Sequence, residues 1–478
     1  MWTAAKNELK PITRLAIPLV AAFLGYQLMG LVDTFVSGQL GVETLAATSL
    51  ANALFWVITI FPMGVLMGLD PIIAQALGAQ KKKQAWQACK DGLGLALVFG
   101  ILTIPILFYF SAQGWPWSPK GAVSEQLLAY MYGRIYCVPL LMIHTCVRCF
   151  LQAHERGSII LIGTGISNVL NLFLSVYLGG GDALLTQLKL PSLGYIEHGL
   201  GAYGIGLASS IVLCAEVSLL CFQAYKIGQS PESSSVSSVE NTQALESTEA
   251  VMTLKQRWKQ LIRIGAPVGG SMLSEGGVFS SSTLIVSAWA PIVVGAHQVT
   301  LQIASMTFII SLGIANATTV RVGHAVGSGD WQRARGAGVV GMLFSLAMMS
   351  CSALGFLVFG EDIAGLITMD QQVIHLAGEL LMIAAAFQLF DGLQVTAAAA
   401  LRGAGLTKIP LYSAIISHWG VGLPLALLMA FYVGLEVHGL WWGLCGGLCT
   451  AAFILCYQFF SVTHQALQQD LTENSVPK

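Results

Sequence analysis

Residues 228–250 read GQSPESSSVSSVENTQALESTEA and form the longest polar interruption in a chain of 478 residues. The segment is rich in serine and glutamate and has almost no apolar side chains. It cannot bury enough hydrophobic surface to pack, so we predict a flexible linker. The linker divides the chain into an expected N-lobe at 1–227 and an expected C-lobe at 256–478, with the linker itself at 228–255.

Twelve segments are apolar and long enough to cross a bilayer, since a spanning α-helix needs about 20 mostly apolar residues. They are residues 13–37, 46–69, 89–111, 127–151, 158–178, 200–225, 260–290, 294–318, 335–359, 375–400, 410–433 and 437–462. Six precede the linker and six follow it. The sequence thus predicts an all-α integral membrane protein with two six-helix bundles.

The composition agrees with a membrane protein. Hydrophobic residues make up 55% of the chain, charged residues only 10%, and the mean hydropathy is +0.71. A soluble domain carries about 25% charged residues. The net charge of −1 excludes the basic field that a nucleic-acid partner requires. The first apolar segment continues to about Ser37 without a small-residue cleavage site, so we expect a retained membrane helix rather than a signal peptide.

The basic residues predict the orientation, because Lys and Arg near helix ends stay in the cytoplasm. With the N-terminus inside, 20 of the 23 basic residues fall on the cytoplasmic side. Only Lys120, Arg134 and Lys189 fall outside. We therefore expect both termini and the linker in the cytoplasm and the chain in a bacterial inner (plasma) membrane.

The two halves repeat one another. Arg14 and Pro18 recur as Arg263 and Pro267, each 249 residues later. Each half has an even number of spans, so the repeats share one orientation and are related by an axis along the membrane normal. The substrate path is expected between the two lobes.

Four acidic residues lie inside the predicted spans: Asp33, Glu216, Glu275 and Asp391. A charge at the centre of a spanning helix costs about 2.5 to 3.5 kcal/mol, so each must face protein, water or an ion. Glu275 and Asp391 lie on different helices of one lobe, where two carboxylates can share Na⁺ or a proton. The alternative is that each is protonated and hydrogen-bonded at a helix interface.

A second oxygen-rich site is expected in the N-lobe. Asp33 lies in the first span, and the fifth span contributes Asn168, Asn171 and Ser175. Asn171 and Ser175 are four residues apart and so project from one helical face. The alternative is that these groups only hydrogen-bond across helices and hold them together. For Glu216 the sequence indicates no partner, and its role stays open.

Other chemistry is not favoured by the sequence. Cys146 and Cys149, with His144 just before them, lack a second ligand pair and are expected to be small core residues rather than a metal site. An intramembrane enzyme is a weak alternative, because no GxSxG or HExxH motif is present. A lipid-linked or metabolite flippase is a second alternative, which predicts a wide cationic groove.

Several stretches resemble the multidrug and toxic compound extrusion (MATE) transporters, nearest to the NorM-like bacterial branch, and the resemblance covers essentially the whole chain. They are GLVDTFVSGQLGVETLAATSLA at 30–51, GLDPIIAQALGAQKKKQA at 68–85, LIRIGAPVGGSMLSEGGVF at 261–279, the run at 293–335 that begins VVGAHQVTLQ, and FQLFDGLQVTAAAALRGAGLTKIP at 387–410. The resemblance implies a V-shaped pair of bundles that exports drugs by alternating access.

The resemblance also implies site residues. The positions that bind the coupling cation in that branch correspond to Glu275 and Asp391, which makes them the candidate Na⁺ site. The N-lobe acid corresponds to Asp33 and its partner to Asn171. Here Ser175 occupies a position that is usually Asp or Asn in the family, and Ser209 matches a position where relatives often have Thr.

We therefore predict a multidrug efflux transporter that exchanges inward Na⁺ or H⁺ for outward amphipathic or cationic drugs. The same carboxylates serve either ion, so the sequence leaves the choice between Na⁺ and H⁺ open. Apart from this ion we expect no cofactor. The protein is expected to be a monomer surrounded by membrane lipids.

Overall fold

The computed structural model describes residues 2–112, 120–189, 191–192, 194, 196–229 and 252–474. Within these ranges all regular secondary structure is helical, as the apolar segments predict. Residues 230–251, which form most of the predicted linker, lie outside the described residues.

Each predicted span corresponds to a helix, a bent helix pair or a run of consecutive helical segments. The first half contains α1 (Trp2–Leu40), α2 (Val42–Leu66), α3 (Leu69–Gly78), α4 (Lys82–Ala112), α5 (Ala122–Arg134), α6 (Cys137–Ala153), α7 (Gly157–Gln187) and α8 (Gly201–Gly228). The second half contains α9 (Leu254–Val286), α10 (Pro291–Gly327), α11 (Trp331–Gly365), α12 (Gln371–Gly403), α13 (Lys408–Ala414), η2 (Ile415–Gly422), α14 (Leu423–Leu427), η3 (Leu428–Tyr432) and α15 (Glu436–Asn474).

Among the described residues, ten helices are long and apolar enough to cross a membrane, and the pair of α5 and α6 makes an eleventh span. The remaining predicted span is α9. It has 33 residues, a length of about 50 Å. Its first turns contain several Lys and Arg residues, and its middle contains Gly, Ser and Glu275. The mean hydropathy of α9 is therefore low, although the helix is long enough to cross a membrane.

The fourth span is not one straight helix as the sequence suggested. α5 and α6 are bent by 47° at a short break, and Arg134 is the last residue of α5. Arg134 therefore lies at a break within the fourth span, and its position on the outer side of the membrane stays a prediction. The eleventh predicted span contains two π-helical segments, η2 and η3, a geometry that is rare and is frequently found at functional sites.

Packing divides the chain into two compact units. They differ from the two halves of the sequence, because a few short segments of each half pack in the other unit. The C-terminal unit comprises Met1–Val20, Asp70–Lys81 and Pro267–Lys478, and the N-terminal unit comprises Ala21–Leu69 and Lys82–Ala266. The start of α1 thus packs with the second half of the sequence, and the start of α9 with the first. The lobe boundaries at 227 and 256 stay a prediction.

Buried ion pairs explain this exchange of segments. In the C-terminal unit, the Glu8 carboxylate accepts hydrogen bonds from Arg321 Nε at 2.7 Å and from Arg333 Nε at 2.6 Å. In the N-terminal unit, Arg257 Nε donates to Asp91 Oδ2 at 2.6 Å. Charged groups that leave water need such partners, so each pair holds the end of one helix against residues distant in sequence.

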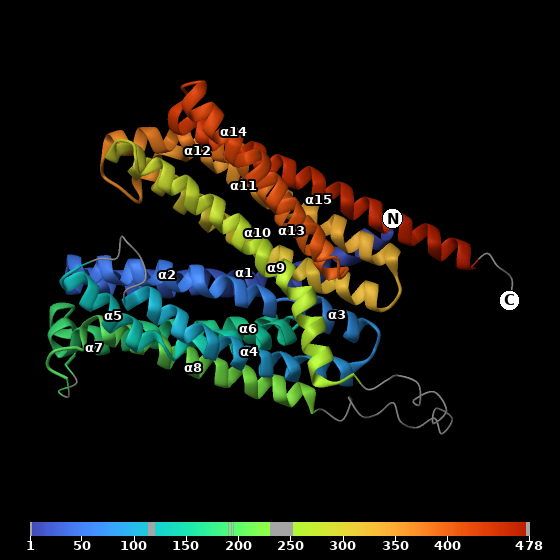
Figure 1. The fold of residues 1–478 in the computed structure, drawn as a ribbon, viewed down its shortest axis with the longest axis horizontal. Helices are drawn as coiled ribbons and strands as arrows, with labels where there is room; N and C mark the ends of the chain where they lie inside the picture. The colour runs from blue at the N-terminus through green and yellow to red at the C-terminus, as the bar shows by residue number, and fades with distance from the viewer. Residues whose placement is uncertain are drawn as a thin grey trace. The chain divides into compact units, whose positions relative to one another are not determined.

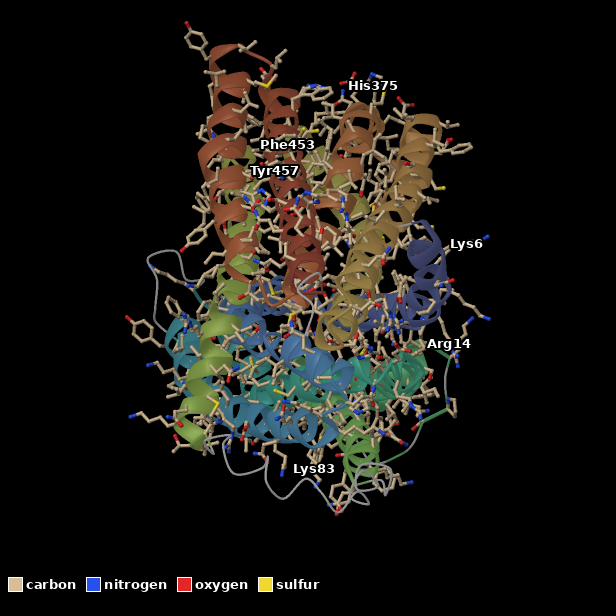
Figure 2. The ribbon with its side chains drawn as sticks, turned by 90° about the vertical axis from the view of Figure 1, so that its right-hand side faces the viewer. Lys6, Arg14, Lys83, His375, Phe453 and Tyr457 are labelled. Carbon is tan, nitrogen blue, oxygen red and sulfur yellow. The ribbon has the colours of Figure 1, made fainter. Side chains whose placement is uncertain are left out.

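In the C-terminal unit, α12 packs against α10, α11 and α15 (Figure 1). Its core includes an aromatic contact, in which the ring centroids of Phe387 and Trp441 are 5.7 Å apart and the ring planes are inclined by 59°. Phe453 and Tyr457, labelled in Figure 2, are one turn apart on α15 and are exposed at 73% and 63%. Large exposed apolar side chains on such a helix match a lipid-facing surface.

In the N-terminal unit, α8 packs against α5, α6 and α7 (Figure 1). Two glycines bring α5 and α8 close together. A Cβ added at Gly133 would lie 2.3 Å from the Tyr203 carbonyl oxygen, and one at Gly206 would lie 2.3 Å from the Tyr130 carbonyl oxygen. Small residues permit such close crossings between membrane helices. The crossing positions the residues of the N-terminal unit described below.

Candidate functional site

In the C-terminal unit, Gln394 joins the two predicted cation-binding acids. Its Nε2 donates to Glu275 Oε1 at 2.9 Å and lies 3.4 Å from Asp391 Oδ1. Asp391 and Gln394 are three residues apart on α12 and so share a face, whereas Glu275 comes from α9. Asp391 and Gln394 are each 5% exposed. One side-chain amide therefore lies within hydrogen-bonding reach of carboxylates from two helices.

The π-helical segment η2 completes the surroundings of Glu275. Trp419 Nε1 donates to the carbonyl oxygen of Ser274 at 3.1 Å. The neighbouring His418 is buried, and its charge, when protonated, would interact with that of Glu275. A π-turn widens a helix and changes the direction of its side chains. In η2 the consecutive residues His418 and Trp419 face Glu275 and the neighbouring Ser274 carbonyl, respectively.

The electrostatics of this C-terminal site favour a cation. The charges of Glu275 and Asp391 interact with each other, and like charges in a low-dielectric environment repel. Arg402, on α12, interacts with Glu275 and with Asp70. One arginine is thus shared between two acids. A proton or a Na⁺ held by carboxylate and amide oxygens would remove the remaining repulsion.

Among the described residues, no cluster of three or more His, Cys, Asp and Glu side chains is arranged to hold a metal ion. The pair of carboxylates falls below that number. Any ion held there would need further oxygen ligands from amides, backbone carbonyls or water.

In the N-terminal unit, Asp33 accepts hydrogen bonds from three predicted site residues. Asn171 Nδ2 and Ser175 Oγ donate to its Oδ1 at 3.1 and 2.9 Å, and Ser209 Oγ donates to its Oδ2 at 2.9 Å. All four side chains are buried. The helices α1, α7 and α8 thus bring these residues into one cluster. Hydrogen bonds to a carboxylate are charge-assisted and stabilise its ionised form.

Asn168 is oriented differently. Its Nδ2 donates to the carbonyl oxygen of Thr164 at 2.9 Å, on its own helix. The Oδ1 of Asn171 is buried and has no hydrogen-bond partner within the part of the chain that the structure describes. The cluster around Asp33 therefore retains one unused acceptor.

Sequence reasoning missed Arg134 as a member of this region. Its guanidinium donates to Asn52 and to the Tyr130 hydroxyl, and lies 4.5 Å from the centroid of the Phe55 ring. Its charge interacts with that of Asp33. The N-terminal unit therefore contains its own cation close to Asp33. The signal in the sequence was an arginine inside an apolar segment, which was counted only among the basic residues on the outer side.

Glu216 also has partners that the sequence did not indicate. Tyr26 of α1, His144 of α6 and Thr164 of α7 surround its carboxylate. His144 was considered only as a neighbour of Cys146 and Cys149, because its distance along the chain from Glu216 hides the contact.

These features define a class of protein: a multi-pass helical membrane transporter, built from repeated halves with carboxylates buried between its spans. The MatE family model matches residues 18–177 and again 267–428. The chain therefore belongs to the MATE family, whose members are transporters and not enzymes. The two matches begin 249 residues apart, which is the spacing of the repeat in the sequence.

Relatives match along nearly the whole chain. The probable multidrug resistance protein NorM of Xanthomonas axonopodis pv. citri is 31% identical over 461 residues, covering 95% of this chain and 94% of the relative. The protein of the same name from Deinococcus radiodurans is 32% identical over 463 residues, covering 95% of each.

Solved structures share the fold. A mutant of the Vibrio cholerae MATE transporter VcmN has a TM-score of 0.81 at 18% identity, covering 97% of this chain and 98% of that one. The eukaryotic MATE transporter AtDTX14 has a TM-score of 0.78 at 18% identity, covering 98% and 99%. The expected twelve-helix transporter fold is thereby confirmed.

Proposed function

We propose that this chain is a drug:cation antiporter, which exports amphipathic or cationic drugs and takes up Na⁺ or H⁺ in exchange. The observation that carries the proposal is the single amide of Gln394 between the carboxylates of Glu275 and Asp391. Two acids held together inside a membrane protein require a cation or a proton for part of the cycle. The names of the NorM relatives support drugs as the substrates.

The proposed cycle couples the cation to a change of access. A cation bound between Glu275 and Asp391 cancels their repulsion and stabilises one conformation, whereas the empty pair favours the other. A ligand shifts such an equilibrium only by its difference in affinity for the two states. The drug must therefore bind preferentially to the state without the cation. Asp33 would bind a proton or attract the cationic drug.

The experiment is dye efflux from proteoliposomes with separately imposed sodium and pH gradients. In Glu275→Gln and Asp391→Asn we expect cation-driven efflux to fall about tenfold or more, since losing one charged ligand removes about 1.4 kcal/mol or more of cation affinity. The matched control is Asp362→Asn, which changes an exposed acid on α11. Undiminished efflux in both site variants would refute the proposal, and the gradient that drives transport identifies the ion.

The proposed setting is a bacterial inner membrane, with the protein as a monomer and both termini in the cytoplasm. Lys6 and Arg14, exposed on α1, and Lys83, exposed at the start of α4, extend away from the ribbon (Figure 2). Basic side chains of this kind remain in the cytoplasm. Labelling a single cysteine introduced at Lys6 or Lys83 from outside intact cells should fail.

A further inference from the structure

Glu216 is the one acid, among the four that the sequence placed inside spans, that the proposed exchange does not use. It lies on α8 and is 2% exposed, and the His144 and Thr164 side chains beside it are 5% and 1% exposed. Tyr26 OH is 2.9 Å from Glu216 Oε1 and 3.0 Å from His144 Nε2. The tyrosine hydroxyl therefore bridges the carboxylate and the imidazole.

Counting hydrogens determines the direction of these bonds. A tyrosine has one hydroxyl hydrogen, and donating it to Glu216 leaves its oxygen to accept from His144. The Nε2 of His144 must then carry a hydrogen. Thr164 Oγ1 lies 3.1 Å from Glu216 Oε1 and 3.0 Å from the carbonyl oxygen of Ile160, so its single hydrogen serves only one of them at a time.

The other carboxylate oxygen is unpaired. Glu216 Oε2 is buried and has no hydrogen-bond partner among the residues that the structure describes. An ionised carboxylate with an empty oxygen is costly in such a place. A neutral carboxyl group carrying its hydrogen on Oε2 removes that charge. The unpaired oxygen thus lies where one proton can be added.

The neighbouring positive charges oppose that cost and favour the ionised carboxylate. His144 Nε2 is 3.6 Å from Glu216 Oε1, so a protonated imidazole would hold the carboxylate ionised. Arg148, one turn from His144 on α6, carries a second positive charge, and its guanidinium lies 5.5 Å from the Phe23 ring centroid. On α4, which packs against α6, the acid Asp91 is already paired with Arg257.

We propose that Glu216 and His144, bridged by Tyr26, form a proton-binding site in the N-terminal unit that is separate from the cluster around Asp33. On uptake, a proton from water forms an O–H bond at Glu216 Oε2, and on release that bond breaks and the proton returns to water. No electron transfer or co-reactant is needed. Only the link to the transport cycle rests on the proposed function, where this site would make export depend on pH even if Na⁺ drives it.

The first test is infrared difference spectroscopy of the purified full chain in lipid nanodiscs, recorded on acidification. We expect a carboxylic-acid C=O band that is lost in Glu216→Gln and retained in Asp33→Asn. In Tyr26→Phe and Thr164→Val the band should shift in frequency but persist, because the acid keeps its proton and loses one donor. An unchanged set of bands in folded Glu216→Gln would overturn the proposal.

Glu216→Asp provides a second variant, because it keeps an acid in place if the glutamine variant does not fold. It should retain a C=O band at a shifted frequency, and the absence of any titrating band would contradict the site. The second measurement is the pH profile of dye efflux, which should shift in His144→Gln and stay in place in Asp362→Asn, an exposed acid on α11 outside both sites. If the pH profile of efflux were the same in the His144 variant and in the control variant, the site would have no role in transport. The infrared result does not depend on efflux, so it distinguishes failure of this proposal from failure of the antiporter function.

Discussion

Replacing Glu8 by glutamine tests the idea that a buried ion-pair cluster fastens the start of α1 to the C-terminal unit. Arg321 donates to the Glu8 carboxylate through Nε at 2.7 Å and through Nη2 at 2.9 Å, and Arg333 adds a third hydrogen bond at 2.6 Å. The Glu8 side chain is 4% exposed and that of Arg321 is 10% exposed. The glutamine keeps the shape of the side chain and removes its negative charge, so Arg321 loses the carboxylate that accepts two of its hydrogen bonds.

Breaking a buried pair by removing one partner costs about 3 to 5 kcal/mol. Arg333 is 36% exposed, so water can solvate it and its share is small. We therefore expect the free energy of unfolding to fall by about 3 kcal/mol in Glu8→Gln. The apparent melting temperature should fall by several degrees, compared at one scan rate because membrane proteins often unfold irreversibly.

The assay is thermal unfolding in detergent, followed by intrinsic tryptophan fluorescence. Glu43→Gln is the matched control, because Glu43 is exposed in the first turn of α2 and its replacement should change the melting temperature little. Replacing both Glu8 and Arg321 with apolar residues of similar volume should recover much of the loss, since the charge that then lacks its carboxylate is Arg333, which is 36% exposed and reaches water. Equal melting temperatures for Glu8→Gln and Glu43→Gln would refute the reasoning.

Two further predictions concern the N-terminal unit. Gly206→Ala should destabilise the protein by about 1 to 3 kcal/mol, because the added Cβ would meet the Tyr130 carbonyl oxygen; Gly30→Ala, where nothing lies within 4 Å, is the control in the same melting assay. Ser175→Asp should make stability depend on sodium, because it places a second carboxylate beside Asp33. Identical sodium titrations of wild type and Ser175→Asp would contradict this.

The sequence predicted the helices well because membrane insertion is a local property. Each apolar segment carries its own signal, and all twelve expected segments are helical in the structure. The repeat with an offset of 249 residues could also be found, since it requires only a comparison of the two halves of the sequence. The sequence also identified the acids, because a charge within an apolar segment is conspicuous and expensive.

The partners of those acids could be predicted only in part. The contact of Asp33 with Asn171 and Ser175 was foreseen from helical spacing and resemblance. Gln394, between Glu275 and Asp391, was missed, because a glutamine in a helix resembles any other polar residue until the facing helix is known. The same holds for the bridge of Tyr26 between His144 and Glu216, whose members are more than a hundred residues apart.

The sequence by itself determined that this protein crosses the membrane repeatedly and that its two halves are repeats of one another. It also determined which acids must be kept away from lipid. Hydropathy, periodicity and the cost of charge in lipid act along the chain and are readable there. The tertiary structure alone decided that the start of α1 packs with the second half, that the fourth span breaks at Arg134, and which side chains share a carboxylate. These depend on distances between helices far apart in sequence, which no local property specifies.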